Sequence, residues 1–133
     1  MNYSFQLFKL IITTKSSRNN NFGIQNNIPI FGIKFRMTIV TYKRITEFIE
    51  KHNDSKIALQ EWYYKTTKAN WENVSDIKKT FNNFDFIGNN RAVFNIRGNQ
   101  YRLVAIVIFG SGKVYIRFIG THSEYDKINC KTV

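Results

Sequence analysis

Residues 91–119 read RAVFNIRGNQYRLVAIVIFGSGKVYIRFI. Apolar and polar residues alternate along the start of this stretch, with a period of two that is typical of a half-buried β-strand. Gly98-Asn99 predicts a tight connection into a second strand over 100–109. A Gly-Ser-Gly triplet then predicts the turn into a third strand over 113–119. The stretch therefore predicts an antiparallel meander of three or four strands.

The alternation assigns the strand residues to two faces of the expected sheet. One face is apolar and is expected to form the core, and it carries Ala92, Phe94, Ile96, Val114, Ile116 and Phe118. The other face is polar and is expected to stay open, and it carries Arg91, Asn95, Arg97, Tyr115 and Arg117, with Arg102 able to join from the middle strand.

Upstream of the meander, the apolar residues change to helical spacing. A short strand over 38–41 is expected to precede a helix over 42–52. Asp54 or Ser55 can cap a second helix, whose apolar positions lie along one side. Ser75 is expected to cap a shorter helical turn.

Downstream of the meander, Thr121-His122-Ser123-Glu124 has the pattern of a capping box, which predicts a final short helix through Ile128. The order is then a strand, helices, a strand meander and a short helix. This order implies an α+β domain, in which N-terminal helices pack on one face of a curved, mostly antiparallel sheet.

The chain is strongly basic. Its 133 residues include 20 Lys and Arg but 9 Asp and Glu, so the net charge is +11 and the isoelectric point is near 9.9. No acidic residue lies within 91–119. Such a charge favours encounter with polyanions, so nucleic acid, the ribosome or an acidic membrane surface are the natural partners. The alternative interpretation is that the charge serves solubility alone.

The composition changes near Met37. Residues 1–36 contain five basic residues and no acidic one, whereas residues 37–133 contain fifteen basic and nine acidic residues, a net charge of +6. No helical or strand period persists in the first segment. Two interpretations are open: a disordered basic arm that binds RNA, or upstream sequence translated from a misplaced start, with Met37 the true initiator. We favour the second, with a single domain over 37–133.

Membrane, secreted and zinc-binding classes lack support in the sequence. The apolar stretch over 5–12 is too short to span a bilayer, and no small-residue cleavage site follows it. Cys130 is a single cysteine, so no internal disulfide can form, and His52 and His122 are too far apart in the sequence for zinc-ligand spacing. We therefore expect a cytoplasmic protein with no membrane partner, no metal and no cofactor.

The polar face of the meander has the composition of an RNA-binding surface. Arginine binds phosphate through two hydrogen bonds and stacks on bases, and tyrosine also stacks. We assign Arg91, Asn95, Arg97 and Tyr115 to RNA binding. The alternative is that these residues are merely the solvated side of an amphipathic sheet.

RNA cleavage without a metal needs an acid, a base and cations that stabilise the phosphorane. His122, Tyr125 and Asp126 follow the last basic strand directly, and an imidazole suits either proton-transfer role near neutral pH. Arg102 and Arg117, together with Arg97, are assigned to stabilising the phosphate. A capping or packing role for His122 stays open, and His52 is interpreted as structural.

Four segments of the sequence resemble a known family. Trp62-Tyr63 and Lys68-Ala69-Asn70-Trp71 are followed by the run from Arg91 to Leu103, and the stretch from Val114 to Ile128 looks like a C-terminal signature. In this order they are similar to the HigB toxins of type II toxin–antitoxin systems. The resemblance covers about residues 38–130 and none of 1–36.

The resemblance implies a RelE-like fold and a ribosome-dependent, metal-independent endoribonuclease that cleaves mRNA and inhibits translation. It also implies neutralisation by a helix-turn-helix antitoxin of the HigA type, with operator DNA bound only through the toxin–antitoxin complex. The residues that it carries over are Arg91, Asn95, Arg97, Arg102, Arg117, His122, Tyr125 and Asp126. The alternatives are a non-catalytic basic module that blocks translation by binding RNA or the ribosome, and a degenerate toxin that retains only antitoxin binding.

Overall fold

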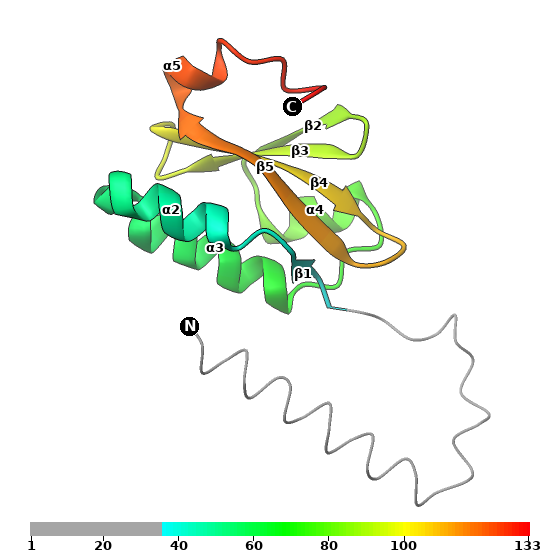
Figure 1. The fold of residues 1–133 in the computed structure, drawn as a ribbon. Coiled ribbons are helices and arrows are strands. Elements are labelled where there is room, and N and C mark those ends of the chain that lie inside the picture. Colours follow the sequence, from blue (N-terminus) through cyan, green and yellow to red (C-terminus); the bar gives the residue numbers. More distant parts are fainter. Residues whose placement is uncertain (1–35) are drawn as a thin grey trace, which may run out of the picture. The chain divides into compact units, whose positions relative to one another are not determined.

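The computed structural model describes residues 36–133, so all of the predicted extension except Arg36 lies outside the described range. These residues form one mixed sheet, in the order β1-β5-β4-β3-β2, together with several helices (Figure 1). The elements are β1 (Thr38–Ile39), α2 (Lys43–Lys51), the 3-10 turn η3 (Asn53–Ser55), α3 (Lys56–Lys68), α4 (Val74–Thr80), β2 (Phe84–Gly88), β3 (Arg91–Ile96), β4 (Tyr101–Ile108), β5 (Lys113–Thr121) and α5 (His122–Tyr125).

The arrangement confirms the predicted α+β class. Strands β2 to β5 form an antiparallel meander of four strands, and β1 adds to β5 in parallel. Helices α2 and α3 lie on one side of the sheet, whereas α5 and the C-terminal segment lie on the other (Figure 1). Within residues 36–133, no helix is long and apolar enough to cross a membrane.

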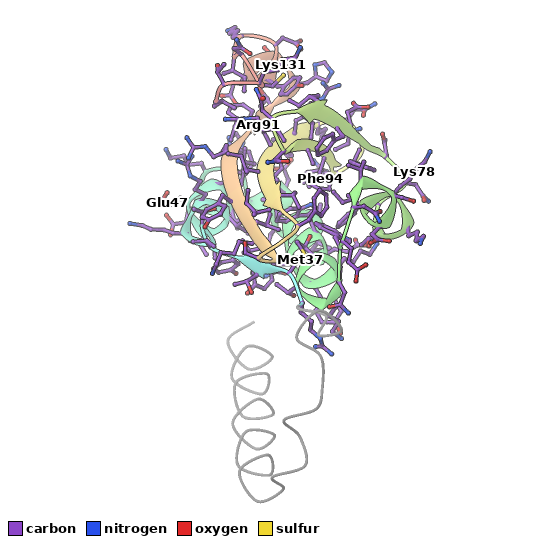
Figure 2. All side chains as sticks on the ribbon, turned by 90° about the vertical axis from the view of Figure 1, so that its right-hand side faces the viewer. Met37, Glu47, Lys78, Arg91, Phe94 and Lys131 are labelled. Atoms are coloured by element: carbon purple, nitrogen blue, oxygen red, sulfur yellow. The ribbon has the colours of Figure 1, made fainter. Side chains whose placement is uncertain are left out.

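An aromatic cluster between the helices and the sheet forms the centre of the core. The ring centroids of Trp62 and Phe81 lie 5.4 and 5.2 Å from that of Phe94. Trp71 also stacks on Phe94, and its indole nitrogen donates a hydrogen bond to Thr80. Figure 2 shows Phe94 in the interior of the molecule. The predicted core positions on β3 are therefore confirmed, and both tryptophans belong to the core.

The prediction that Phe118 lies on the core face is wrong. Val104 pairs with Phe118, but the next residue, Ala105, pairs with Ile116. Arg117 is thus the extra residue of a β-bulge, which breaks the period of two. Beyond the bulge Ile119 packs against the helix-side core, and Phe118 lies on the other face, where its ring contacts Tyr125.

The predicted helix caps are confirmed only in part. Ser55 occupies the N-cap position of α3, as one of the two predicted candidates, but its hydroxyl donates to the carbonyl of His52 and makes no cap hydrogen bond. The other candidate, Asp54, accepts hydrogen bonds from the first residue of β4. Helix α4 begins after Asn73, whose side chain accepts from the Asp76 amide, so Asn73 is the cap rather than Ser75.

The face of the sheet opposite the helices is not uniformly open, contrary to the expectation. Val93 and Val104 are buried on it, and the C-terminal segment packs over this region. Arg91 donates two hydrogen bonds to the carbonyl of Val133, at 3.1 and 2.8 Å. Figure 2 shows Arg91 beneath the C-terminal segment that carries Lys131. The face is therefore divided into a covered part, over β3, and an exposed part near α5.

Side chains just before and within the first turn of α2 bind the edge of β5 that extends beyond the short β1. The Thr41 hydroxyl accepts from the Ile116 amide at 2.6 Å, and Arg44 donates to the Arg117 carbonyl at 3.1 Å. These bonds replace strand pairing at an edge that would otherwise present free backbone groups. They also fix α2 alongside the strand that leads to His122.

Candidate active site

Four of the residues that the sequence assigned to catalysis meet at the end of β5. Arg102 Nη2 lies 2.9 Å from His122 Nε2, and His122 Nδ1 lies 3.2 Å from Asp126 Oδ2. The guanidinium carbon of Arg102 lies 4.6 Å from the centre of the Tyr125 ring, within the range of a cation–π contact. A cation, an imidazole, a carboxylate and a phenol therefore form one exposed or half-exposed cluster.

Local structure explains why α5 presents His122 here. The Thr121 hydroxyl accepts from the Glu124 amide, and the Glu124 carboxylate accepts from the Thr121 amide, which completes the predicted capping box. Gly120 pairs with Arg102 across the strands, and a Cβ at Gly120 would overlap the Phe118 ring and the Glu124 carboxylate. The glycine thus allows the helix to begin directly beside Arg102.

The hydrogen bonds define the tautomer of His122. A guanidinium has only donors, so Nε2 has to accept from Arg102, which places the ring proton on Nδ1. That proton then donates to the Asp126 carboxylate. His122 is therefore oriented as a general base would be, with the lone pair of Nε2 bound by Arg102. A phosphate that draws Arg102 away would free this lone pair for a substrate hydroxyl.

Tyr125 is protonated near neutral pH. Burial of its ring, followed by its contacts with the Cys130 thiol, raises the pKa of the Tyr125 hydroxyl, and Arg102 opposes this shift. The hydroxyl can therefore donate a hydrogen bond or a proton, but it is not a base. Arg102 Nε is buried without a partner within the described residues, a cost in stability that is typical of functional sites.

Arg117 is not part of this cluster. No contact within residues 36–133 joins its side chain to Arg102, His122 or Tyr125, and its exposed side chain leaves the strand at the β-bulge. Its backbone carbonyl is bound by Arg44 of α2.

The four residues assigned to RNA binding do not converge. Arg91 is held under the C-terminal segment, and Asn95 donates to the Asn83 side chain at 2.8 Å. Arg97 lies in the turn after β3 with φ of 52°, where it binds Asp54 and Gln100. Tyr115 is half-buried on β5.

Asp54 is a residue whose role the sequence did not reveal. The Tyr101 hydroxyl donates to both of its oxygens, at 2.7 and 2.9 Å, and Arg97 forms an ion pair with it at 2.5 Å. Tyr101 precedes Arg102, and the neighbouring Gln100 carbonyl accepts from the His122 amide at 3.3 Å. Asp54 therefore links the helix layer to the strand end that carries the cluster.

We expect this link to depend on pH. The Tyr101 hydrogen bond, aided by Arg97, holds the pKa of Asp54 below its usual value of 3.8. A lowered pKa in the folded state stabilises the protein fully above about pH 5, and this stability is lost as pH falls through the folded-state value. Denaturant titrations should show wild type more stable than Asp54→Asn from pH 5 to 7, with the difference shrinking below pH 3.8. An equal difference at pH 3 and pH 6 would contradict the assignment.

No group of three or more His, Cys, Asp or Glu side chains suited to a metal occurs in the part of the chain that the structure describes. The cluster can donate a proton, accept one and stabilise a negative charge with its own side chains. Such a set of groups is suited to acid–base chemistry.

Comparison with known proteins connects this geometry to a family. Residues 55–128, which include the whole cluster, match the family model of the HigB toxin, described as the RelE-like toxic component of a toxin–antitoxin system. The chain belongs to the HigB toxin family. The RelE-like class expected for the fold is thereby confirmed.

Curated relatives agree with this membership. The mRNA interferase toxin HigB of Escherichia coli strain K12 is 34% identical over 93 residues, which cover 68% of this chain and 88% of the relative. The mRNA interferase HigB of Shigella flexneri matches equally well. A third relative, the mRNA interferase HigB of Escherichia coli O6:H1, is 24% identical over 69% of this chain and 91% of its own length.

Proposed function

We propose that this HigB-family toxin is an endoribonuclease that cleaves mRNA, and that it does so on the ribosome without a metal. The observation that carries the proposal is the chain of contacts from Arg102 through His122 to Asp126, in a member of a family whose relatives are named mRNA interferases. The strongly basic charge of the chain, +11, supports a polyanionic substrate.

The proposed step is attack of the 2′-hydroxyl on the adjacent phosphorus. His122 Nε2 accepts the hydroxyl proton, the oxygen bonds to phosphorus, and the bond to the 5′-oxygen breaks. Tyr125, which is protonated, is the candidate that returns a proton to the leaving 5′-oxygen. The products are a 2′,3′-cyclic phosphate and a 5′-hydroxyl.

The two arginines and Asp126 have different roles in this step. Arg102 moves from His122 to the phosphorane and neutralises its charge. Asp126 keeps the His122 proton on Nδ1. Arg117 keeps its assigned role as a second cation, but since no contact within the described residues holds it at the cluster, Arg117→Ala should reduce cleavage less than Arg102→Ala.

The partners follow from the same proposal. A toxin–antitoxin toxin has an antitoxin, and we propose that it is a helix-turn-helix protein of the HigA type, with operator DNA bound only by the complex. The ribosome would present the mRNA to the exposed cluster in the cytoplasm. Residues 1–36 are proposed to be dispensable, whether as an extension or as a product of a misplaced start.

Induction of the full chain in a bacterium without the antitoxin tests the proposal. Growth and mRNA 5′ ends are measured together. The 5′ ends are compared between a transcript that is translated and the same transcript without its start codon. We expect growth arrest with new cuts inside the translated frame only. A parallel induction of residues 37–133 should give the same result.

The other outcomes have distinct meanings. Arrest with intact transcripts would favour the non-catalytic module that blocks translation. Cuts in both transcripts would support the nuclease but contradict its dependence on the ribosome. No arrest by the full chain would favour a degenerate toxin.

A further inference from the structure

The C-terminal segment, residues 126–133, lies on the same side of the sheet as α5, and Arg91 binds its far end. Arg91 donates from Nε and Nη2 to the carbonyl oxygen of Val133, at 3.1 and 2.8 Å. Its remaining nitrogen, Nη1, donates to the Asn89 carbonyl at 3.3 Å. All three nitrogens of this guanidinium are therefore bound within the protein.

The last residues of the C-terminal segment have a defined local conformation. The Asn129 carbonyl accepts from the amides of Thr132 and Val133, at 3.1 and 3.0 Å, and the Asn129 side chain accepts from the Lys131 amide at 3.1 Å. These bonds form a tight turn that presents the Val133 carbonyl. Asn89, in the turn between β2 and β3, also donates to the Lys131 carbonyl at 3.4 Å. The segment is therefore bound to this turn at two points.

The near end of the C-terminal segment carries part of the candidate active site. Helix α5 has four residues, His122–Tyr125, and Asp126 follows it directly. A helix of one turn is not stable by itself, so its position depends on what holds its two ends. The capping box holds the first end, and the C-terminal segment continues from the other. Within this segment the Cys130 thiol contacts the side chain of Tyr125, so the position of Tyr125 depends on the segment.

The Arg91 side chain is not itself part of the cluster. In the register of β3 and β4, Arg102 lies opposite Asn95, which is four residues after Arg91 on β3. Four residues of extended strand measure about 13 Å. No contact within the described residues joins the side chain of Arg91 to Arg102 or His122. Arg91 can therefore influence the cluster only through the C-terminal segment, or by binding RNA outside the cluster.

We propose that Arg91 is a positioning residue for RNA cleavage, which fixes the C-terminal segment on the sheet and so holds Tyr125 and Asp126 in the cluster. The inference rests on the proposed nuclease function. It differs from the assignment of Arg91 to RNA binding, because a guanidinium whose three nitrogens are bound within the protein is less available to a phosphate. The opposite role, in which the segment keeps RNA away from Arg91, predicts faster cleavage when the segment is released.

The test uses the full chain and ribosomes loaded with mRNA, on which the single-turnover rate of cleavage is measured against toxin concentration. We expect Arg91→Ala to lower the rate at saturation about tenfold, since displacement of a catalytic group by about 1 Å can cost up to about 100-fold. The half-saturating concentration should not change. Arg91→Lys retains the charge but not the planar fork, and should recover part of the rate. Lys78→Ala, which removes an exposed charge from α4, is the matched control and should leave both values unchanged.

The Cys130 thiol gives a direct measure of the C-terminal segment. Cys130 is the single cysteine of the chain and is half-buried, so its rate of reaction with an aromatic disulfide reports local opening of the segment. Arg91→Ala should raise this rate at least about threefold under native conditions, whereas Lys78→Ala should not. Unfolding midpoints of the variants show that both assays sample the folded protein.

A shorter chain that ends at Lys131 separates positioning from RNA binding, because it lacks the acceptor of Arg91 but keeps every basic residue. It should lose as much cleavage rate as Arg91→Ala. Adding Arg91→Ala to it should have little further effect, since both changes break one interaction. Additive losses would mean that Arg91 binds RNA itself, and a raised rate in either variant would mean that the segment inhibits cleavage. Either result would overturn the proposal.

The two proposals fail separately. If Arg102→Ala abolishes cleavage but Arg91→Ala cuts at the wild-type rate, the nuclease stands and the positioning role is overturned. If the wild type does not cut mRNA, the nuclease is overturned, and the reaction rate of Cys130 alone shows whether Arg91 fixes the segment.

Discussion

Replacing Arg102 with alanine is expected to reduce mRNA cleavage at least about 100-fold, the loss typical of removing one preorganised group that stabilises transition-state charge. Arg102 is the cation held in the cluster by both His122 and the Tyr125 ring. Growth after induction and quantitative mapping of mRNA ends measure the effect.

Two further variants separate charge from packing at this position. Arg102→Met retains the aliphatic stem over Tyr125 but removes the charge, so it should be as inactive as alanine and closer to wild type in stability. Arg102→Lys retains a charge but not the planar fork, and should recover only part of the activity. Cleavage by Arg102→Met at the wild-type rate would contradict the role of the guanidinium.

Replacing His122 with alanine is expected to reduce cleavage by about 100- to 10,000-fold, the usual contribution of a general acid or base. The side chain is exposed, so stability should change little. Asp126→Asn should lose less, because it leaves the imidazole in place and weakens only the bond that orients it.

Chemical rescue distinguishes a base from a capping residue. Added imidazole should partly restore the alanine variant. Cleavage by His122→Ala at the wild-type rate would mean that His122 serves only the start of α5.

Local signals in the sequence predicted the parts of the site that depend on neighbours in the chain. The capping box from Thr121 to Glu124 predicts α5, and the spacing of His122 and Asp126 is that of contacts one helical turn apart. The alternation over β3 likewise predicts its buried positions. Each of these features is set within a few residues.

Features that depend on pairing between distant segments could not be predicted. The bulge at Arg117 arises from the register of β4 and β5, and it reverses the face of Phe118. The covering of Arg91 depends on where the C-terminal segment packs. Asp54 resembles a helix cap in the sequence, since nothing local shows that Tyr101 and Arg97 will reach it.

If the Arg102–His122–Asp126 cluster cleaves mRNA by attack of the 2′-hydroxyl, the chemical groups at the transcript ends record this attack. These ends are measured after induction of the full chain, beside the Arg102→Ala variant. We predict 2′,3′-cyclic phosphate and 5′-hydroxyl ends at the cut sites, and neither in the variant. Cut sites with 3′-hydroxyl and 5′-phosphate ends, or the same cuts in the variant, would contradict this mechanism.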